Sequence, residues 1–258
     1  MTGALESALR AQRDAGRKLL VPYVTGGLPG WGDAVAAMAG AGADAVEVGI
    51  PFSDPVMDGP TIQEASERAL ARGTTPEGVL ADIDRLDAGI PVVVMTYYNP
   101  VFRFGHERFA DRLRAVGVSG AIVPDLPLEE LEPWATAADA AGVETVLLAA
   151  PTAPDERLPV ICERSRGFVY GVALLGVTGE REQLASTTRE IAERLKAVTD
   201  KPVLVGVGIS TPDQAAEACE VADGVVIGSA VVRRMLDSEG PESAAEFVAA
   251  VRKRIDEG

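Results

Sequence analysis

The sequence contains few of the residues that build metal sites and disulfides. Histidine occurs once, as His106, so a site that needs several histidine ligands, such as that of a zinc-dependent aldolase, is excluded. The only cysteines, Cys162 and Cys219, lie far apart in the chain without a Cys-x-x-Cys spacing. This favours two reduced, buried thiols over a disulfide. We expect no metal in this chain.

Long hydrophobic runs are missing as well. No apolar run approaches the roughly 20 residues that cross a membrane. Residues 1–17 are polar and have helical character, without the apolar core of a signal peptide. From these two absences we expect a soluble protein of the cytoplasm.

Positive charge is scarce, because 39 acidic residues outnumber 24 Lys and Arg, for a net charge of −15. Such a surface repels nucleic acids and anionic membranes, although it permits one phosphate site built from backbone amides. Only four lysines are present, and none follows a predicted strand: Lys18, Lys196, Lys201 and Lys253. Schiff-base chemistry is therefore not expected.

Short apolar runs recur along the chain, each followed by a segment of helical periodicity. They are continuously apolar, which is typical of strands covered on both faces. Eight such units in 258 residues predict an α/β fold, a (β/α)8 barrel that forms a single domain over residues 1–258. The expected strands are residues 19–25, 45–50, 91–97, 120–124, 145–149, 168–173, 202–207 and 224–227.

Helix signals separate these strands. Thr75 and Thr211 each precede a proline and are expected to cap a helix. Apolar spacing predicts further helices at residues 31–41, 128–141 and 187–198. An additional helical segment is expected between the second and third strands.

Carboxylates are concentrated around the end of the second strand. Glu47 interrupts an apolar strand, and Asp58 follows on the next loop. An inward-facing Glu47 beside Asp58 would supply two acid–base groups at the barrel mouth. Two alternatives are open: a glutamate facing outward beneath a helix, or a structural ion pair. Asp54 lies in a Ser-Asp-Pro sequence that is typical of a turn.

Glycines follow three consecutive late strands, at residues 176–179, 206–210 and 228–229. Glycines at any one of these segments would be weak evidence for a binding site, because glycines are common in turns. Backbone N–H groups at these positions of a barrel, however, commonly bind phosphate. Together with the carboxylates, they predict acid–base chemistry on a phosphorylated substrate. His106 is expected in a solvent-exposed loop.

Residues 47–63, EVGIPFSDPVMDGPTIQ, resemble the signature of the tryptophan synthase alpha chain family. Further similar segments are PYVT at 22–25, MTYYNP at 95–100, GVTG at 176–179 and GVGIS at 206–210. The similarity covers nearly the whole chain. It implies a (β/α)8 barrel lyase that splits indole-3-glycerol phosphate into indole and D-glyceraldehyde 3-phosphate by a retro-aldol reaction in tryptophan biosynthesis.

The resemblance also implies residue roles. Glu47 would be the principal acid and base, and Asp58 would stabilise positive charge at the indole N–H. The implied substrate- and phosphate-binding residues are Tyr170, Thr178, Gly179, Gly208, Gly228 and Ser229.

Members of this family pair with a beta chain in a complex of two alpha and two beta chains. The resemblance implies that pyridoxal phosphate belongs to that partner and that this chain holds no cofactor. Asp54, Pro55 and Asn99 would face the beta chain. Two positions depart from the family pattern: Leu174 stands where many relatives have arginine, and Leu28 where aspartate is usual. Both departures concern regulation more than chemistry.

Two other functions are compatible with parts of the pattern. Another phosphate-binding barrel enzyme, such as a sugar-phosphate isomerase or an indole-glycerol-phosphate synthase, would share the late glycines but lack the segment with Glu47 and Asp58. A non-catalytic barrel that only activates a partner would have no need of a buried glutamate.

Overall fold

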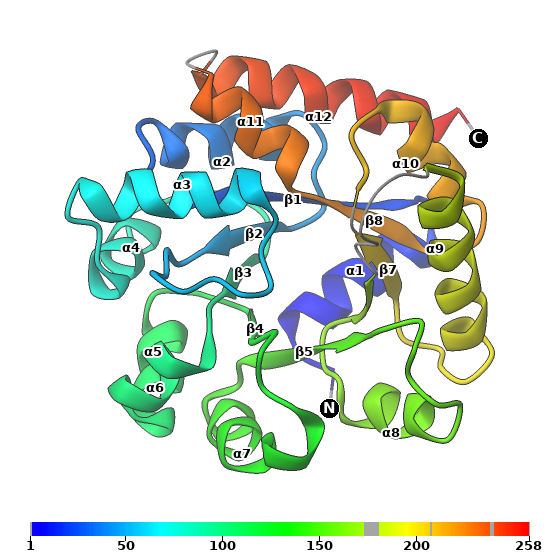
Figure 1. Ribbon diagram of the computed structural model, residues 1–258, viewed down its shortest axis with the longest axis horizontal. Coiled ribbons are helices and arrows are strands. Elements are labelled where there is room, and N and C mark those ends of the chain that lie inside the picture. The colour runs from blue at the N-terminus through cyan, green and yellow to red at the C-terminus, as the bar shows by residue number, and fades with distance from the viewer. Residues whose placement is uncertain (1, 173–180, 207, 238–239, 258) are drawn as a thin grey trace.

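The computed structural model describes residues 2–172, 181–206, 208–237 and 240–257, with residues 181–185 described by their backbone alone. Within these residues, parallel strands β1 to β8 pair in sequence order and close into a barrel (Figure 1). The predicted barrel is confirmed. The strands are β1 Leu19–Thr25, β2 Val46–Gly49, β3 Val92–Met95, β4 Gly120–Ile122, β5 Glu144–Ala149, β6 Val169–Val172, β7 Val203–Gly206 and β8 Gly224–Ile227.

Helices surround the barrel, and α1 is the exception because it lies inside the ring that the others form (Figure 1). Two helices, α3 and α4, connect β2 to β3, as expected. The helices are α1 Ala4–Asp14, α2 Trp31–Gly40, α3 Pro60–Ala71, α4 Pro76–Ile83, α5 Tyr98–Phe104, α6 His106–Ala115, α7 Glu132–Ala141, α8 Arg157–Arg164, α9 Arg181–Lys196, α10 Pro212–Cys219, α11 Ser229–Leu236 and α12 Gly240–Asp256.

Most predicted boundaries lie within a few residues of those observed. Thr75 accepts a hydrogen bond from the Gly78 N–H, and Thr211 forms a capping box with Gln214, so both caps are confirmed. The helix predicted over 128–141 is wrong as one element. It divides into a 3-10 turn, Leu128–Glu130, and α7, because Pro133 has no N–H and so favours a helix start.

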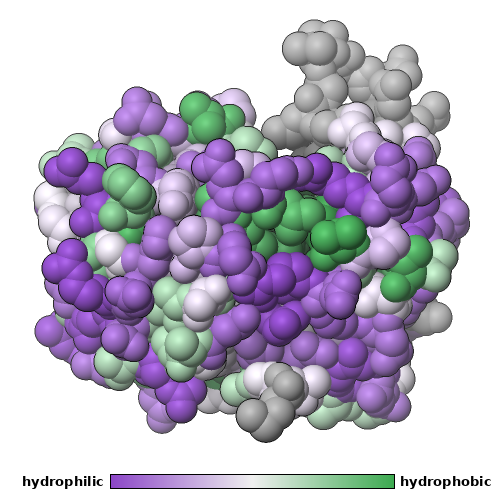
Figure 2. Space-filling model, turned by 90° about the horizontal axis from the view of Figure 1, so that it is seen from below, coloured by the Kyte–Doolittle hydropathy of each residue, from purple (hydrophilic) through white to green (hydrophobic). Residues whose placement is uncertain are grey.

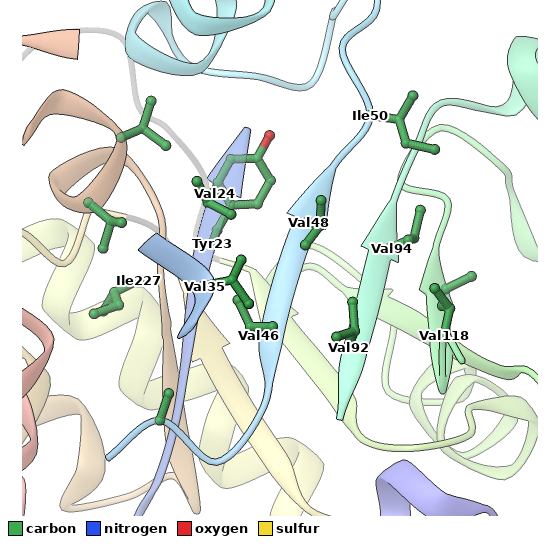
Figure 3. Packing of buried hydrophobic residues seen from close by; sticks show 14 of the residues in the cluster. Tyr23, Val24, Val35, Val46, Val48, Ile50, Val92, Val94, Val118 and Ile227 are labelled. Atoms are coloured by element: carbon green, nitrogen blue, oxygen red, sulfur yellow. The ribbon is translucent and has the colours of Figure 1, made fainter. Parts of the chain in front are cut away.

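Side chains of each strand alternate between the helices and the barrel interior. On β2, Val46 and Val48 pack in the cluster between the strands and the surrounding helices (Figure 3). Glu47 lies between them in sequence and therefore points to the opposite side, into the barrel. The strand itself thus sets the direction of the glutamate.

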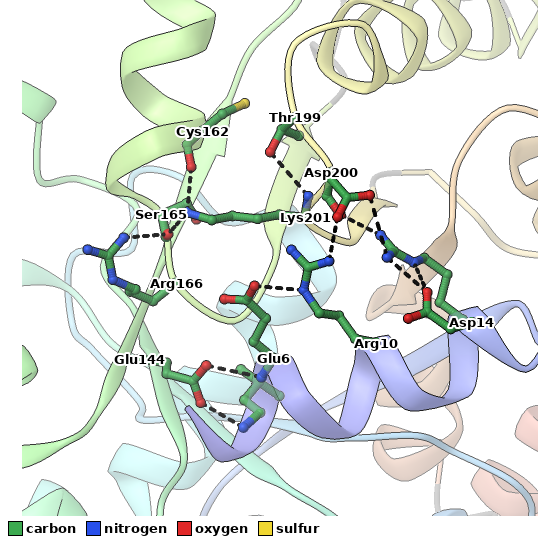
Figure 4. A network of polar contacts seen from close by, with 12 residues as sticks. Glu6, Arg10, Asp14, Glu144, Cys162, Ser165, Arg166, Thr199, Asp200 and Lys201 are labelled. Atoms are coloured by element: carbon green, nitrogen blue, oxygen red, sulfur yellow. Dashed lines mark hydrogen bonds and ion pairs between the residues drawn. The ribbon is translucent and has the colours of Figure 1, made fainter. Parts of the chain in front are cut away.

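One end of the barrel interior is filled by α1. Leu5 and Leu9 of α1 are fully buried in a cluster with interior side chains such as Leu19 and Phe168. The buried Glu144 carboxylate accepts hydrogen bonds from the N–H groups of Leu5 and Glu6 at 2.6 and 3.0 Å (Figure 4). Among the described residues, α1 therefore covers the amino-terminal end of the barrel interior.

The face of the molecule drawn in Figure 2 is mainly hydrophilic. Hydrophilic side chains cover most of the face in Figure 2, and hydrophobic ones form smaller groups. Among the described residues, no helix combines the length and the apolar character that crossing a membrane requires.

The carboxylate of Glu144 is expected to hold α1 in place. Glu144→Ala leaves two buried N–H groups without an acceptor and should lower the free energy of unfolding by about 1–3 kcal/mol. Glu144→Gln keeps one acceptor oxygen and should lose less. Urea unfolding of both variants tests this, and an alanine variant as stable as the wild type would contradict it.

Candidate active site

A cavity of about 520 Å3 opens at the carboxyl ends of the strands. It brings together six of the residues that the sequence predicted for the site: Glu47, Asp58, Tyr170, Gly208, Gly228 and Ser229. Thr178 and Gly179 lie outside the described residues, and so does Leu174, one of the two positions that differ from the family pattern. Leu28, the other departure, is buried in the core.

Glu47 lies at the inner wall of this cavity and is 2% exposed. Its Oε2 atom has no hydrogen-bond partner among the described residues. Burial, and then the negative charge of Asp58, raise the Glu47 pKa to about 8. Glu47 faces the cavity and forms no ion pair within the described residues, so the alternatives of an outward glutamate and a structural ion pair are wrong. At neutral pH this carboxyl is protonated.

Asp58 lies on the loop between β2 and α3, also facing the cavity. Burial raises the Asp58 pKa to about 6, and a hydrogen bond from the Tyr97 hydroxyl opposes this rise. The Tyr97 oxygen in turn accepts a hydrogen bond from the Met57 N–H at 3.0 Å, and its ring stacks on Phe52. At neutral pH the site thus holds a protonated Glu47 and an ionised Asp58, two carboxyls with different roles available.

Two tyrosines, the buried Tyr23 and the partly buried Tyr170, complete the polar part of the cavity. A Cβ atom at Gly49 would overlap the Tyr23 hydroxyl, and one at Gly206 would crowd that of Tyr170. Burial raises the pKa of both phenols, so they stay neutral. The sequence analysis did not assign Tyr23 or Tyr97 to the site; the available signals were the place of Tyr23 within the first predicted strand and of Tyr97 at the end of the third.

The remaining wall is apolar and suits a flat hydrophobic ring. Side chains from five different strands or strand ends contribute to it: Met95, Ile122, Leu148, Ile209 and Val226.

The part of the cavity where α11 begins is suited to an anion. Helix α11 starts at Ser229, directly after Gly228, so its first N–H groups and its positive dipole end lie at the cavity. Gly208 has a φ of 73°, a left-handed conformation that favours glycine. No Lys or Arg is among the described lining residues, so backbone N–H groups and the Ser229 hydroxyl are the donors available here.

The outer rim carries the predicted partner contacts. Asp54 and Asn99 are exposed and Pro55 is half-buried. Large exposed hydrophobic side chains lie on the same loop and on α5: Val56 at 78%, Met57 at 52% and Phe102 at 64%.

His106 is not a solvated loop residue as the sequence suggested. It begins α6, stacks on Tyr98 and shares a 3.0 Å hydrogen bond between its Nε2 and the Tyr98 hydroxyl. Lys18 precedes β1 and Lys201 precedes β7, and the ammonium groups of both donate to backbone carbonyls. Cys162 and Cys219 are buried and free.

An unpaired buried carboxyl should make stability fall as pH rises. Between pH 4.5, the ordinary pKa, and about 8, folded Glu47 keeps a proton that the unfolded chain has lost. Glu47→Gln should therefore be more stable than the wild type at pH 8, by about 2–4 kcal/mol, and the difference should shrink toward pH 5.

Urea unfolding at the two pH values measures this difference. The control is Glu67→Gln, which alters an exposed glutamate of α3 and should change little at either pH. An effect of Glu47→Gln that is the same at pH 5 and pH 8 would contradict a raised Glu47 pKa.

The comparisons with known proteins agree with this geometry. Residues 9–257 match the family model described as Tryptophan synthase alpha chain. The chain is 47% identical to the tryptophan synthase alpha chain of Thermobifida fusca, covering 95% of this chain and 93% of that one. It is 42% identical to the alpha chain of Streptomyces coelicolor, covering 98% and 96%.

Solved structures show the same similarity in three dimensions. A structure of Mycobacterium tuberculosis tryptophan synthase matches with a TM-score of 0.90 and 39% identity, over 99% of each chain. The alpha chain from Legionella pneumophila matches with a TM-score of 0.88 and 30% identity, over 99% of this chain and 98% of that one. The chain belongs to the tryptophan synthase alpha chain family, the lyases of tryptophan biosynthesis that cleave indole-3-glycerol phosphate to indole and glyceraldehyde 3-phosphate.

Proposed function

We propose that Glu47 and Asp58 carry out the proton transfers of the retro-aldol cleavage. The observation behind this proposal is the buried Glu47 Oε2 atom, which has no partner within the described chain and faces the cavity that also contains Asp58. A carboxyl in this setting exchanges a proton with the substrate rather than with the protein.

The reaction begins with the protonated form of Glu47. Its proton goes to C3 of the indole, which turns the ring into an electron-accepting indolenine. The bond between C3 and the glycerol chain then breaks, and its electron pair returns to the ring. Glu47, now a carboxylate, accepts the proton of the glycerol hydroxyl as the aldehyde forms, so Glu47 ends protonated and ready for the next cycle.

Asp58 acts on the other side of the ring. Protonation at C3 places positive charge on the indole nitrogen, and an ionised Asp58 accepts the N–H hydrogen bond and stabilises that charge. The pKa values of about 8 for Glu47 and about 6 for Asp58 populate the required combination between these two pH values.

The substrate ring is its own electron sink, so this chain needs no cofactor in the proposed reaction. The pyridoxal phosphate of tryptophan synthase then belongs to the beta chain. The apolar wall formed by residues such as Ile122 and Leu148 holds the indole, and Tyr170 lies beside Glu47 at the cavity wall.

The phosphate is assigned to the amino end of α11. Gly228 and Ser229 present this helix start to the cavity, and Gly208 lies on the same side after β7. Thr178 and Gly179 are proposed to complete the phosphate site from the sequence pattern alone.

A beta chain is the proposed partner. Asp54, Pro55 and Asn99 lie at the rim, beside the exposed hydrophobic side chains of Val56 and Phe102. Such exposed apolar groups at a cavity mouth favour a protein interface. We place the beta chain there, in a complex of two alpha and two beta chains that receives the apolar product indole directly.

Release of indole from indole-3-glycerol phosphate tests the proposal, with and without a purified beta chain. Glu47→Gln preserves shape but cannot transfer a proton, and should lower kcat by about 100- to 10,000-fold. Asp58→Asn should also be severely impaired but retain more activity, since its amide oxygen still accepts the N–H bond. Glu144→Gln alters a buried glutamate at the closed end of the barrel and is the matched control.

Three results would contradict the proposal. Turnover by Glu47→Gln within tenfold of the wild type rules out the proton transfer. Unchanged turnover by Asp58→Asn rules out the charge stabilisation. A wild-type chain that releases no indole, even with the beta chain, indicates a non-catalytic barrel.

A further inference from the structure

A polar contact joins the helix at the phosphate side of the cavity to the helix next to Asp58. The Arg233 guanidinium on α11 donates to Thr61 Oγ1 and pairs with Glu64 Oε2 on α3, both at 3.0 Å. The two helices lie side by side at the outside of the barrel (Figure 1). They come from distant parts of the chain, and the contact lies close to the first turn of each.

On the α11 side, Arg233 follows Ser229 by one helical turn. Ser229 and Gly228 line the cavity where the phosphate is proposed to bind. Arg233 and the first turn of α11 therefore move together, because a helical turn is a rigid unit held by its backbone hydrogen bonds.

On the α3 side, the first turn holds the backbone of Asp58. The Gln63 side-chain amide donates to the Asp58 carbonyl oxygen at 2.8 Å, and the Gln63 N–H donates to the Gly59 carbonyl at 3.0 Å. Thr61, the acceptor for Arg233, belongs to this same turn and itself lines the cavity. The position of Asp58 is thus tied to the turn that Arg233 binds.

A second arginine orients the acceptor on α3. Arg68 pairs with Glu64 at 2.6 Å and donates to the Leu236 carbonyl oxygen at the end of α11. Glu64 therefore lies between two arginines and is fixed on the face that meets α11. The Arg233 and Glu64 side chains are 42% and 35% exposed, so this pair contributes little to folding stability.

We propose that Arg233 is a positioning residue for the lyase reaction. It fixes the first turn of α3 relative to α11, and so sets the separation between Asp58 and the phosphate site. The substrate must contact Asp58 with its indole and the start of α11 with its phosphate at the same time. A small error in that separation therefore misplaces the indole relative to Glu47 and Asp58. This inference rests on the proposed roles of Asp58 and of the α11 start.

Arg233→Met and its neighbour Arg234→Met form a matched pair. Arg234 points to a different partner, since it lies over the Phe247 ring and donates to the Ala230 carbonyl oxygen. Indole release from indole-3-glycerol phosphate should fall about tenfold or more in kcat for Arg233→Met and stay within twofold for Arg234→Met. Both should unfold at the same urea concentration.

Inhibition by glycerol 3-phosphate separates positioning from phosphate binding. This probe carries the phosphate without the indole, so its inhibition constant should stay within twofold of the wild type in Arg233→Met. Arg233→Lys keeps the charge near Glu64 and should recover part of kcat. Thr61→Val removes the same hydrogen bond from the other helix, should lower kcat similarly, and should add little when combined with Arg233→Met.

Equal kcat values for Arg233→Met and Arg234→Met would overturn the inference, as would a tenfold weaker inhibition by glycerol 3-phosphate in Arg233→Met. If Arg233→Met does not fold, Thr61→Val decides on the same criteria. If the wild-type chain is active and Arg233→Met has the same kcat as Arg234→Met, the positioning role is contradicted and the proposed function stands. An inactive wild type overturns both.

Discussion

The structure depends on one costly placement, a carboxyl group inside the barrel without a partner in the described chain. Valine neighbours on β2 pack outward against the helices, so Glu47 has no other direction to take. Burial holds its proton at neutral pH, and the nearby charge of Asp58 strengthens that hold. A stable fold would replace such a group or pair it, whereas a catalyst for proton transfer needs it available.

Other parts of the molecule support this placement. The α1 helix and Glu144 cover the amino-terminal end of the barrel interior, and the cavity that Glu47 lines lies toward the carboxyl ends of the strands. Position 49 is a glycine, and a Cβ atom there would overlap the Tyr23 hydroxyl, so the absence of a side chain leaves room for the Tyr23 phenol. At the rim, α11 begins beside the cavity and α3 follows the loop that carries Asp58, and Arg233 links the two helices.

The barrel and the glutamate could be predicted from sequence because their signals are local. Apolar strands covered on both faces read as continuous runs, and Glu47 interrupts one of them. Tyr23 and Tyr97 were missed as site residues because their closeness to the carboxylates depends on the pairing of β1 with β2 and on a loop contact to Met57. His106 was misjudged for a similar reason, since its partner Tyr98 is reached only after α5 folds. The contact of Arg233 with Thr61 joins distant segments and has no local signature.

The proposed role of Glu47 is tested most directly by measuring its protonation state. Infrared difference spectra of the wild type and Glu47→Gln across pH 5 to 10 would isolate its carbonyl stretch. We predict a protonated carboxyl band at pH 7 that is lost with a midpoint near pH 8 and is absent from the variant. A Glu47 that is already ionised at pH 6 would contradict the proposed role, because the proton for the indole ring would then have to come from another group.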